Sequence, residues 1–297
     1  MRVLAWLVGV VVALVLLLAG WVWWSVAHAD TTTPPARQGQ VDARLYVRGD
    51  GAKHPLLVGL GGSEGGNAWA TDPWKRQRER FLDQGYAMLA LGYFGTPTTP
   101  EHLDRISVDA VHDAIERAKQ DPRVDARCVA VIGGSRGAEL ALLLASAYPD
   151  IHAVVAIVPG SAVFPALTPA MATPGFVLHG KPLPFVPVPW SAAPALLTRD
   201  LRGAFEAMMR DQAAMARAAI PVEDIHGPVM FVSATQDETW PSREMSDAMV
   251  ARMHAHGFRY PVEHLPVEGG HREPLDEFPR MERFLRDNFT NRCGGAR

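Results

Sequence analysis

The sequence predicts an α/β domain with a mostly parallel sheet, helices on both faces of that sheet, and a proline-rich insertion. Apolar stretches of strand length alternate with stretches of helical periodicity, which is typical of parallel strands joined by crossover helices. A glycine-rich turn joins one of these strands directly to a helix. The 297 residues, 48% of them hydrophobic, are enough for one such domain with a large core.

Seven strands and six helices are expected in a domain that spans 43–290. The strands are expected at 43–48, 56–60, 86–91, 128–132, 153–158, 228–233 and 261–266. The helices are expected at 73–84, 104–119, 136–147, 199–217, 243–256 and 275–288. The first helix has a clear start, because Asp72 can cap it and Pro73 suits the first helical position.

One stretch interrupts this alternation. Between about 160 and 198, prolines exclude regular structure at 165, 169, 174, 182, 184, 187, 189 and 194. The same stretch carries four large aromatic side chains, Phe164, Phe176, Phe185 and Trp190. A disordered surface excursion is one interpretation, but this apolar content favours a packed lid or binding loop.

The first 29 residues are predicted to be a membrane anchor or a signal peptide. Residues 3–24 carry no charge, and as a helix they would reach roughly 33 Å, enough to cross a hydrocarbon core of about 30 Å. The tryptophans at 21, 23 and 24 resemble an interfacial belt. Ala27-His28-Ala29 also fits a signal-cleavage pattern, so a secreted domain is the alternative to a retained anchor.

Whether the N-terminus is a retained anchor or a cleaved signal peptide, the domain is expected on the extracytoplasmic or periplasmic side of the membrane. Residues 30–42 are predicted to be a linker and residues 291–297 a tail. The net charge of −3 and the absence of a Lys/Arg run argue against a nucleic-acid partner. The sequence has no metal-ligand motif, so neither a metal nor another cofactor is expected, and the oligomeric state is left open.

The glycine-rich turn predicts a serine nucleophile. Gly133-Gly134-Ser135-Arg136-Gly137 matches the G-x-S-x-G pattern between an apolar strand and an Ala/Leu-rich helix. In that setting a strained turn lifts the serine hydroxyl above the edge of the sheet, and the glycines let strand and helix approach closely. The alternative interpretation is a surface turn that happens to contain serine.

A serine nucleophile needs a base and an acid that orients the base, and later loops offer both. Asp237 follows the expected strand 228–233, with Glu238 as a rival acid. His271 follows the next strand after two glycines, which places it where the base must lie. The other histidines show no catalytic or metal-binding spacing.

The developing oxyanion needs two backbone N–H donors. Arg136, directly after the serine, is expected to supply one. The loop after strand 56–60 should supply the other, with Ser63 as the first choice and Gly62 as the second. A phosphate-binding loop is the competing interpretation, but both the G-x-G-x-x-G spacing and the Walker lysine are missing.

These motifs together resemble the catalytic C-terminal domain of acyl-CoA thioester hydrolases and bile-acid-CoA:amino-acid N-acyltransferases, a family of α/β-hydrolase fold. The resemblance covers about 45–290 and is carried by Gly61–Gly66, Leu91–Gly95, Gly133–Gly137, His179–Pro184, Ile220–Glu223, Asp237–Ser242 and Gly269–His271. It implies a triad of Ser135, Asp237 and His271. Serine rather than cysteine as nucleophile resembles the hydrolase branch. Eukaryotic members carry an N-terminal β-sandwich domain, where this sequence has only the linker.

The leading hypothesis is therefore a serine hydrolase that cleaves an acyl thioester or ester through an acyl-enzyme. The hydrophobic N-terminus favours one alternative, an extracytoplasmic carboxylesterase or dienelactone-type hydrolase, because acyl-CoA is not expected outside the cytoplasm. Acyl transfer to an amine and a non-catalytic, membrane-tethered binding module are the others. Arg136 and Lys181 could meet an anionic leaving group, or could simply be solvated surface charges.

Overall fold

The computed structural model describes residues 2–291, except for the side chains of residues 2–5, 8, 11, 15 and 18. A seven-stranded sheet forms its centre, in the order β1-β3-β2-β5-β6-β9-β10. Its strands are β1 (Asp42–Tyr46), β2 (His54–Leu60), β3 (Ala87–Gly92), β5 (Val124–Gly134), β6 (Ala153–Ile157), β9 (Val229–Ala234) and β10 (Val262–Val267). Edge strand β1 runs antiparallel to β3, and the other neighbours are parallel. The predicted α/β class and all seven predicted strands are confirmed.

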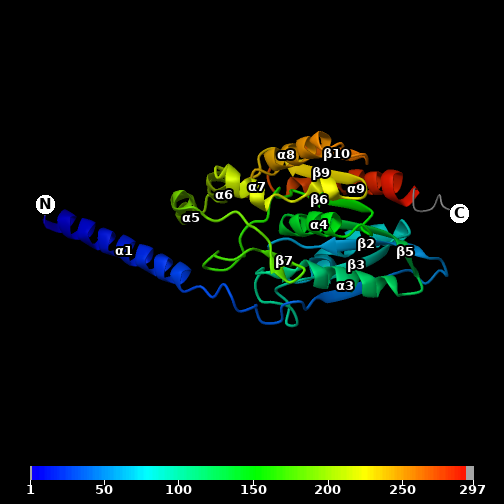
Figure 1. Cartoon of the computed structure of the whole chain (residues 1–297), viewed down its shortest axis with the longest axis horizontal. Coiled ribbons are helices and arrows are strands. Elements are labelled where there is room, and N and C mark those ends of the chain that lie inside the picture. The colour runs from blue at the N-terminus through cyan, green and yellow to red at the C-terminus, as the bar shows by residue number, and fades with distance from the viewer. Residues whose placement is uncertain (1, 292–297) are drawn as a thin grey trace.

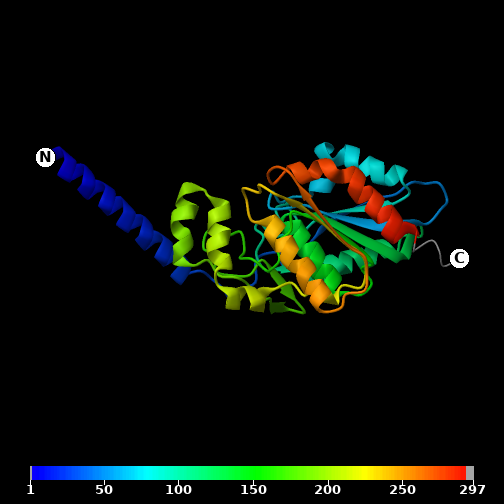
Figure 2. The same ribbon diagram turned by 90° about the horizontal axis from the view of Figure 1, so that it is seen from above.

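Helices cover both faces of the sheet, because the side chains of each buried strand point alternately to the two faces. Leu56 and Val58 pack beneath α3 (Val108–Lys119), α4 (Arg136–Ala147) and α8 (Ser242–Ala255). Leu57, between them, faces the opposite layer, which contains α2 (Lys75–Asp83) and α9 (Phe278–Leu285). The view from above separates these two helical layers (Figure 2).

The proline-rich stretch between β6 and β9 carries more regular structure than its prolines predict, since it contains β7 (Phe176–Leu178), β8 (Lys181–Pro182) and α5 (Ala193–Thr198). The helices α6 (Leu201–Met209) and α7 (Gln212–Ala218) follow it, where a helix over 199–217 was expected. Strand β7 also pairs with β4 (Ile106–Ser107), which makes a second, three-stranded sheet. Several prolines fit this structure because Pro182 lies at an end of a two-residue edge strand and Pro194 in the first turn of α5.

Capping side chains explain why two of the predicted helices have different bounds, whereas the helix expected over 275–288 is shortened to α9 by a 3₁₀ turn before it and a π-helical turn after it. The helix expected over 104–119 begins at Val108, where the Ser107 hydroxyl accepts the Ala110 N–H at 3.1 Å. The helix expected over 199–217 is two helices, capped separately by Asp200 and Asp211. Each capping side chain marks the residue at which a helix begins.

Single turns of tighter or wider helix complete the fold. The 3₁₀ turns are Ala68–Ala70, Asp72–Trp74, Trp190–Ala192, Val222–Asp224 and Glu273–Glu277, and a π-helical turn, Arg286–Thr290, follows α9. Pro73 therefore lies in a 3₁₀ turn directly before α2 rather than in the α-helix itself. Most of the predicted tail, residues 292–297, lies outside the described residues.

The N-terminal helix α1 (Arg2–Ala27) points away from the body, on the side where the insertion lies (Figure 1). Counting only what the structure describes, no helix is both long enough and apolar enough to cross a membrane. This finding does not support the retained membrane anchor expected over residues 1–29, whereas the signal-peptide alternative stays a prediction from sequence.

The predicted linker contacts the body of the domain, although the segment directly after α1 has no helix or strand. The Arg105 guanidinium donates to the carbonyl oxygen of Thr31 at 3.1 Å, and the Gln38 side-chain amide donates to the carbonyl oxygen of Arg105 at 2.8 Å. The predicted linker is thus held against the loop that precedes β4.

Candidate active site

Ser135 lies on the sharp turn between β5 and α4. Its φ of 53° and ψ of −120° are a strained combination for a residue with a side chain. The flanking glycines allow the strand and helix to close on this turn: a Cβ on Gly133 would overlap the carbonyl oxygen of Gly137, and a Cβ on Gly137 that of Gly61. The predicted elbow is therefore present, and it places the half-buried serine at the carboxyl end of the sheet, where it lines a cavity.

Asp237 and His271 are hydrogen-bonded to each other. The His271 Nδ1 lies 2.8 Å from Asp237 Oδ1, which also accepts the backbone N–H groups of Thr239 at 3.0 Å and Trp240 at 3.2 Å. Asp237 is fully buried, which by itself would raise its pKa, but the hydrogen bonds from His271, Ser242 and Thr239 and the charge of His271 lower the pKa overall. An ionised Asp237 keeps the proton on Nδ1 and leaves Nε2 free to act as a base.

The neighbouring carboxyl group has another task. Glu238 Oε2 accepts the backbone N–H of His271 at 2.8 Å, and does not bond to the ring. Of the two rival acids, the structure therefore places Asp237 on the imidazole and Glu238 on the main chain that carries it.

The ring of Trp240 packs edge-on against His271, with 6.2 Å between ring centroids. Its Nε1–H donates to the carbonyl oxygen of Val158 at 3.0 Å. Val158 has a φ of 43°, a rare value for a β-branched residue, at the carboxyl end of β6. Strained backbone of this kind is common at functional sites. Here it places the Val158 carbonyl oxygen where it accepts the hydrogen bond from Trp240, the tryptophan that packs against His271.

Ser135 and His271 line one cavity of about 450 Å³. Apolar side chains form much of its wall, namely Leu60, Trp69, Trp74, Ile157, Val158 and Leu275. Within residues 2–291 no hydrogen bond joins the Ser135 hydroxyl to the His271 ring, a bond that in serine enzymes often tightens only when substrate binds.

Gly62, the second choice of the two predicted loop donors, is buried beside the elbow. A Cβ on Gly62 would lie 3.2 Å from Ser135 Cβ and 3.1 Å from the Gly134 carbonyl oxygen, so this part of the loop packs directly on the elbow. Ser63 also lines the cavity, but it is exposed. The Gly62 N–H is already hydrogen-bonded, since it donates to Glu64 Oε1 at 3.0 Å.

The Arg136 side chain meets neither a leaving group nor solvent, which corrects both interpretations made from the sequence. It is buried, and its Nη1 lies 2.9 Å from Glu139 Oε2 on the next turn of α4. Its Nη2 donates to the carbonyl oxygens of Phe164 and Pro165, while Glu139 accepts the Phe164 N–H at 3.2 Å. Lys181, by contrast, is exposed as one interpretation expected.

The sequence gives one signal for this pair, the i,i+3 spacing of opposite charges on a helix that is otherwise apolar. Burial raises the pKa of Glu139 to about 7, although the nearby Arg136 charge and the Phe164 N–H act to lower it. The pair therefore ties the start of the insertion to the helix that carries the nucleophile.

A second Ser-His-Asp set occurs on β9, β10 and α8, and sequence reasoning missed it. Ser233 Oγ lies 2.7 Å from His264 Nε2, and His264 Nδ1 lies 3.0 Å from Asp247 Oδ1. Ser233 is fully buried within the sheet, so no substrate can reach its hydroxyl. These contacts hold the edge strand β10 to β9 and α8. Ser233 also provides a matched control for Ser135.

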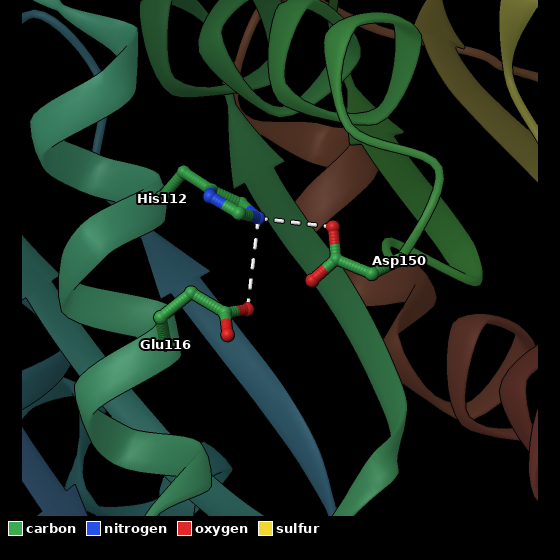
Figure 3. Close-up of side chains that lie close together, drawn as sticks. All are labelled: His112, Glu116 and Asp150. Atoms are coloured by element: carbon green, nitrogen blue, oxygen red, sulfur yellow. Dashed lines mark hydrogen bonds and ion pairs between the residues drawn. The ribbon is translucent and has the colours of Figure 1, made fainter.

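One histidine and two carboxylates gather away from the cavity, with their ligand atoms close enough to hold a metal ion (Figure 3). His112 Nε2 lies 2.9 Å from Asp150 Oδ1 and 3.7 Å from Glu116 Oε1. A cation is already supplied by Lys119, whose Nζ lies 2.5 Å from Glu116 Oε1 and 2.8 Å from Asp150 Oδ2. The cluster therefore acts as an ion network that joins α3 to the loop before β6.

Comparison with known proteins decides the family. Residues 106–292 match the family model described as "BAAT / Acyl-CoA thioester hydrolase C terminal". The chain belongs to this family. Mouse acyl-coenzyme A thioesterase 1 is 25% identical over 242 residues, and mouse acyl-coenzyme A thioesterase 6 is 28% identical over 244 residues. These matches cover 81% and 80% of this chain but 54% and 53% of the relatives, so the chain spans about half of their length.

Several solved structures have the same fold as this chain. A Pyrococcus furiosus esterase matches with a TM-score of 0.55 and 15% identity, covering 80% of this chain and 84% of its own. An alpha/beta hydrolase from Penicillium sp. sh18 matches with a TM-score of 0.53 and 15% identity, covering 84% and 99%. The predicted α/β-hydrolase fold is confirmed.

Proposed function

We propose that this domain hydrolyses an acyl thioester or ester through a serine acyl-enzyme. One observation carries the proposal: a fully buried carboxylate holds the imidazole of His271, and that imidazole lines the same cavity as the strained Ser135. A buried acid, a base whose second nitrogen is free, and a lifted serine form the arrangement that activates a hydroxyl nucleophile.

In the proposed reaction the Ser135 hydroxyl attacks the carbonyl carbon while His271 Nε2 takes its proton. The negative charge that develops on the carbonyl oxygen is stabilised by the backbone N–H groups of Arg136 and Gly62. His271 then returns the proton to the departing thiol or alcohol. In the second half of the reaction His271 Nε2 takes a proton from a water molecule, which attacks the acyl carbon. The bond to Ser135 then breaks, His271 gives its proton to the serine oxygen, and the acid is released.

The family favours an acyl thioester as substrate, since the relatives are named acyl-coenzyme A thioesterases. The apolar wall of the cavity suits an acyl chain. An oxygen ester and the transfer of the acyl group to an amine use the same first step, so they are distinguished by substrates rather than by the triad.

The first test is covalent labelling of the full-length protein with a fluorophosphonate probe. We expect the wild type to be labelled, Ser135→Ala to lose the label, and Ser233→Ala to keep it, because Ser135 lines the cavity and Ser233 is fully buried. An unlabelled wild type, or a label that survives in Ser135→Ala, would contradict the proposal.

The same proteins, supplied with acyl-CoA, p-nitrophenyl esters, or acyl-CoA plus an amine acceptor, identify the reaction. We expect free CoA and free acid from acyl-CoA, with no activity in Ser135→Ala. Turnover of the esters without any acyl-CoA hydrolysis would instead assign a carboxylesterase.

A further inference from the structure

The Glu64 side chain folds back over the two glycines at positions 61 and 62. Its Oε1 accepts the Gly62 N–H at 3.0 Å, and its carboxylate lines the cavity together with Ser135 and His271. Among the described residues this is the only hydrogen bond that the Glu64 carboxylate makes.

The glycines make this position possible. A Cβ on Gly61 would lie 2.8 Å from Glu64 Oε1, and a Cβ on Gly62 would lie 2.9 Å from Glu64 Oε2, closer than real Cβ atoms approach an oxygen. A side chain at either position would push the carboxylate away. The loop therefore accommodates the carboxylate over the backbone N–H of Gly62, the glycine that packs on the elbow.

This placement conflicts with the chemistry of the oxyanion site. The Gly62 N–H is the donor assigned above to the carbonyl oxygen of the substrate, and a well-aligned N–H serves one strong acceptor at a time. A carboxylate is a stronger acceptor than a neutral carbonyl oxygen. Its negative charge would also oppose the negative charge that develops in the transition state.

We propose that Glu64 is an internal competitor for the oxyanion site, whose carboxylate the substrate must displace from the Gly62 N–H before Ser135 can react. The inference rests on the proposed function, because it takes Gly62 as an oxyanion donor. Displacement needs no disruption of the core: Glu64 is exposed, and the next residues, Gly65 and Gly66, have φ values of 67° and 73° that form a turn of small residues.

Three variants of the full-length protein test this inference. Glu64→Ala removes the competing acceptor, and Glu64→Gln keeps its shape without its charge. Glu263→Ala removes an exposed carboxylate from β10, outside the cavity, and serves as the matched control. Circular dichroism and thermal unfolding establish that each variant is folded.

The readout is the affinity for phenylboronic acid, which adds to an active serine and places an oxygen in the oxyanion site, together with kcat and KM for a p-nitrophenyl ester. We expect Glu64→Ala to bind the boronic acid about tenfold more tightly and to lower KM, because a hydrogen bond to a charged acceptor no longer has to be broken. Glu64→Gln should fall between the wild type and Glu64→Ala, and Glu263→Ala should match the wild type.

Weaker boronic-acid binding with a lower kcat in Glu64→Ala would overturn the inference, since Glu64 would then hold the donor loop in place. Unchanged affinity would overturn it as well. Fluorophosphonate labelling of the wild type separates these results from failure of the proposed function. A labelled wild type with no gain in Glu64→Ala rejects the competitor alone, whereas an unlabelled wild type rejects both.

Discussion

At the scale of single residues, two adjacent carboxyl groups serve one histidine in different ways. Asp237 bonds to the His271 ring and Glu238 to its backbone N–H, each at 2.8 Å. Only the ring contact sets which nitrogen carries the proton, so only Asp237 can control the basicity of His271. The buried and ionised state of Asp237 suits that role.

We therefore expect Asp237→Asn to lower kcat by about 10⁴-fold, as loss of the correct imidazole tautomer does in serine hydrolases. Glu238→Gln should lower it by about tenfold or less, since an amide oxygen can still accept the His271 N–H. Steady-state kinetics on an ester substrate compare the two variants. Equal losses, or a larger loss in Glu238→Gln, would assign the acid to Glu238.

At the scale of elements, a buried ion pair joins α4 to the insertion. Arg136 and Glu139 together make three hydrogen bonds to the backbone of Phe164 and Pro165, where the insertion begins. A Cβ on Gly175 would overlap the Arg136 guanidinium, so the return segment of the insertion also packs closely on this pair. The helix that positions the nucleophile and the start of the insertion are thus one packed unit.

This pair predicts how stability depends on pH. The pKa of Glu139 is about 7 in the folded protein, against an ordinary value of 4.5 that the unfolded chain should show. A folded-state pKa above the unfolded value contributes stability below about pH 4.5, and this contribution is lost as the pH rises through about 7. The loss amounts to about 3 kcal/mol at most.

Urea unfolding of the wild type and of Glu139→Gln at pH 5, 6, 7 and 8 tests this linkage. We expect the free energy of unfolding of the wild type to fall with pH relative to the variant, because the amide that replaces the carboxyl group does not titrate. A difference between the two proteins that stays constant from pH 5 to pH 8 would mean that Glu139 is ionised throughout.

At the scale of the whole molecule, the N-terminal helix and the insertion extend from the same side of the sheet (Figures 1 and 2).

The location of the domain is a prediction from sequence: we propose that the uncharged residues 3–24 direct it across a membrane. Protease added to intact spheroplasts should then digest a tag on the C-terminus. Protection of that tag until the cells are lysed would place the domain inside.

Much of the fold and three members of the site could be predicted from local sequence. Each central strand is a short apolar stretch, and the G-x-S-x-G turn follows one of them directly, so Ser135 was identifiable without any long-range contact. Asp237 and His271 follow from the same rule, because parallel strands bring their carboxyl ends to one edge. The proline-rich stretch was less predictable, since β7 and β8 are too short to show a period and α5 has no side-chain cap.

The sequence by itself determined the sheet, the elbow serine and the order in which acid and base follow it, because these depend on periodicity and on residues adjacent in the chain. Tertiary structure alone decided that Glu238 bonds to the backbone N–H of His271, that Arg136 is buried against Glu139, and that Glu64 occupies the Gly62 N–H. Those three outcomes depend on where side chains point when separate loops meet. Such directions arise from packing between segments far apart in the chain, and local patterns do not record them.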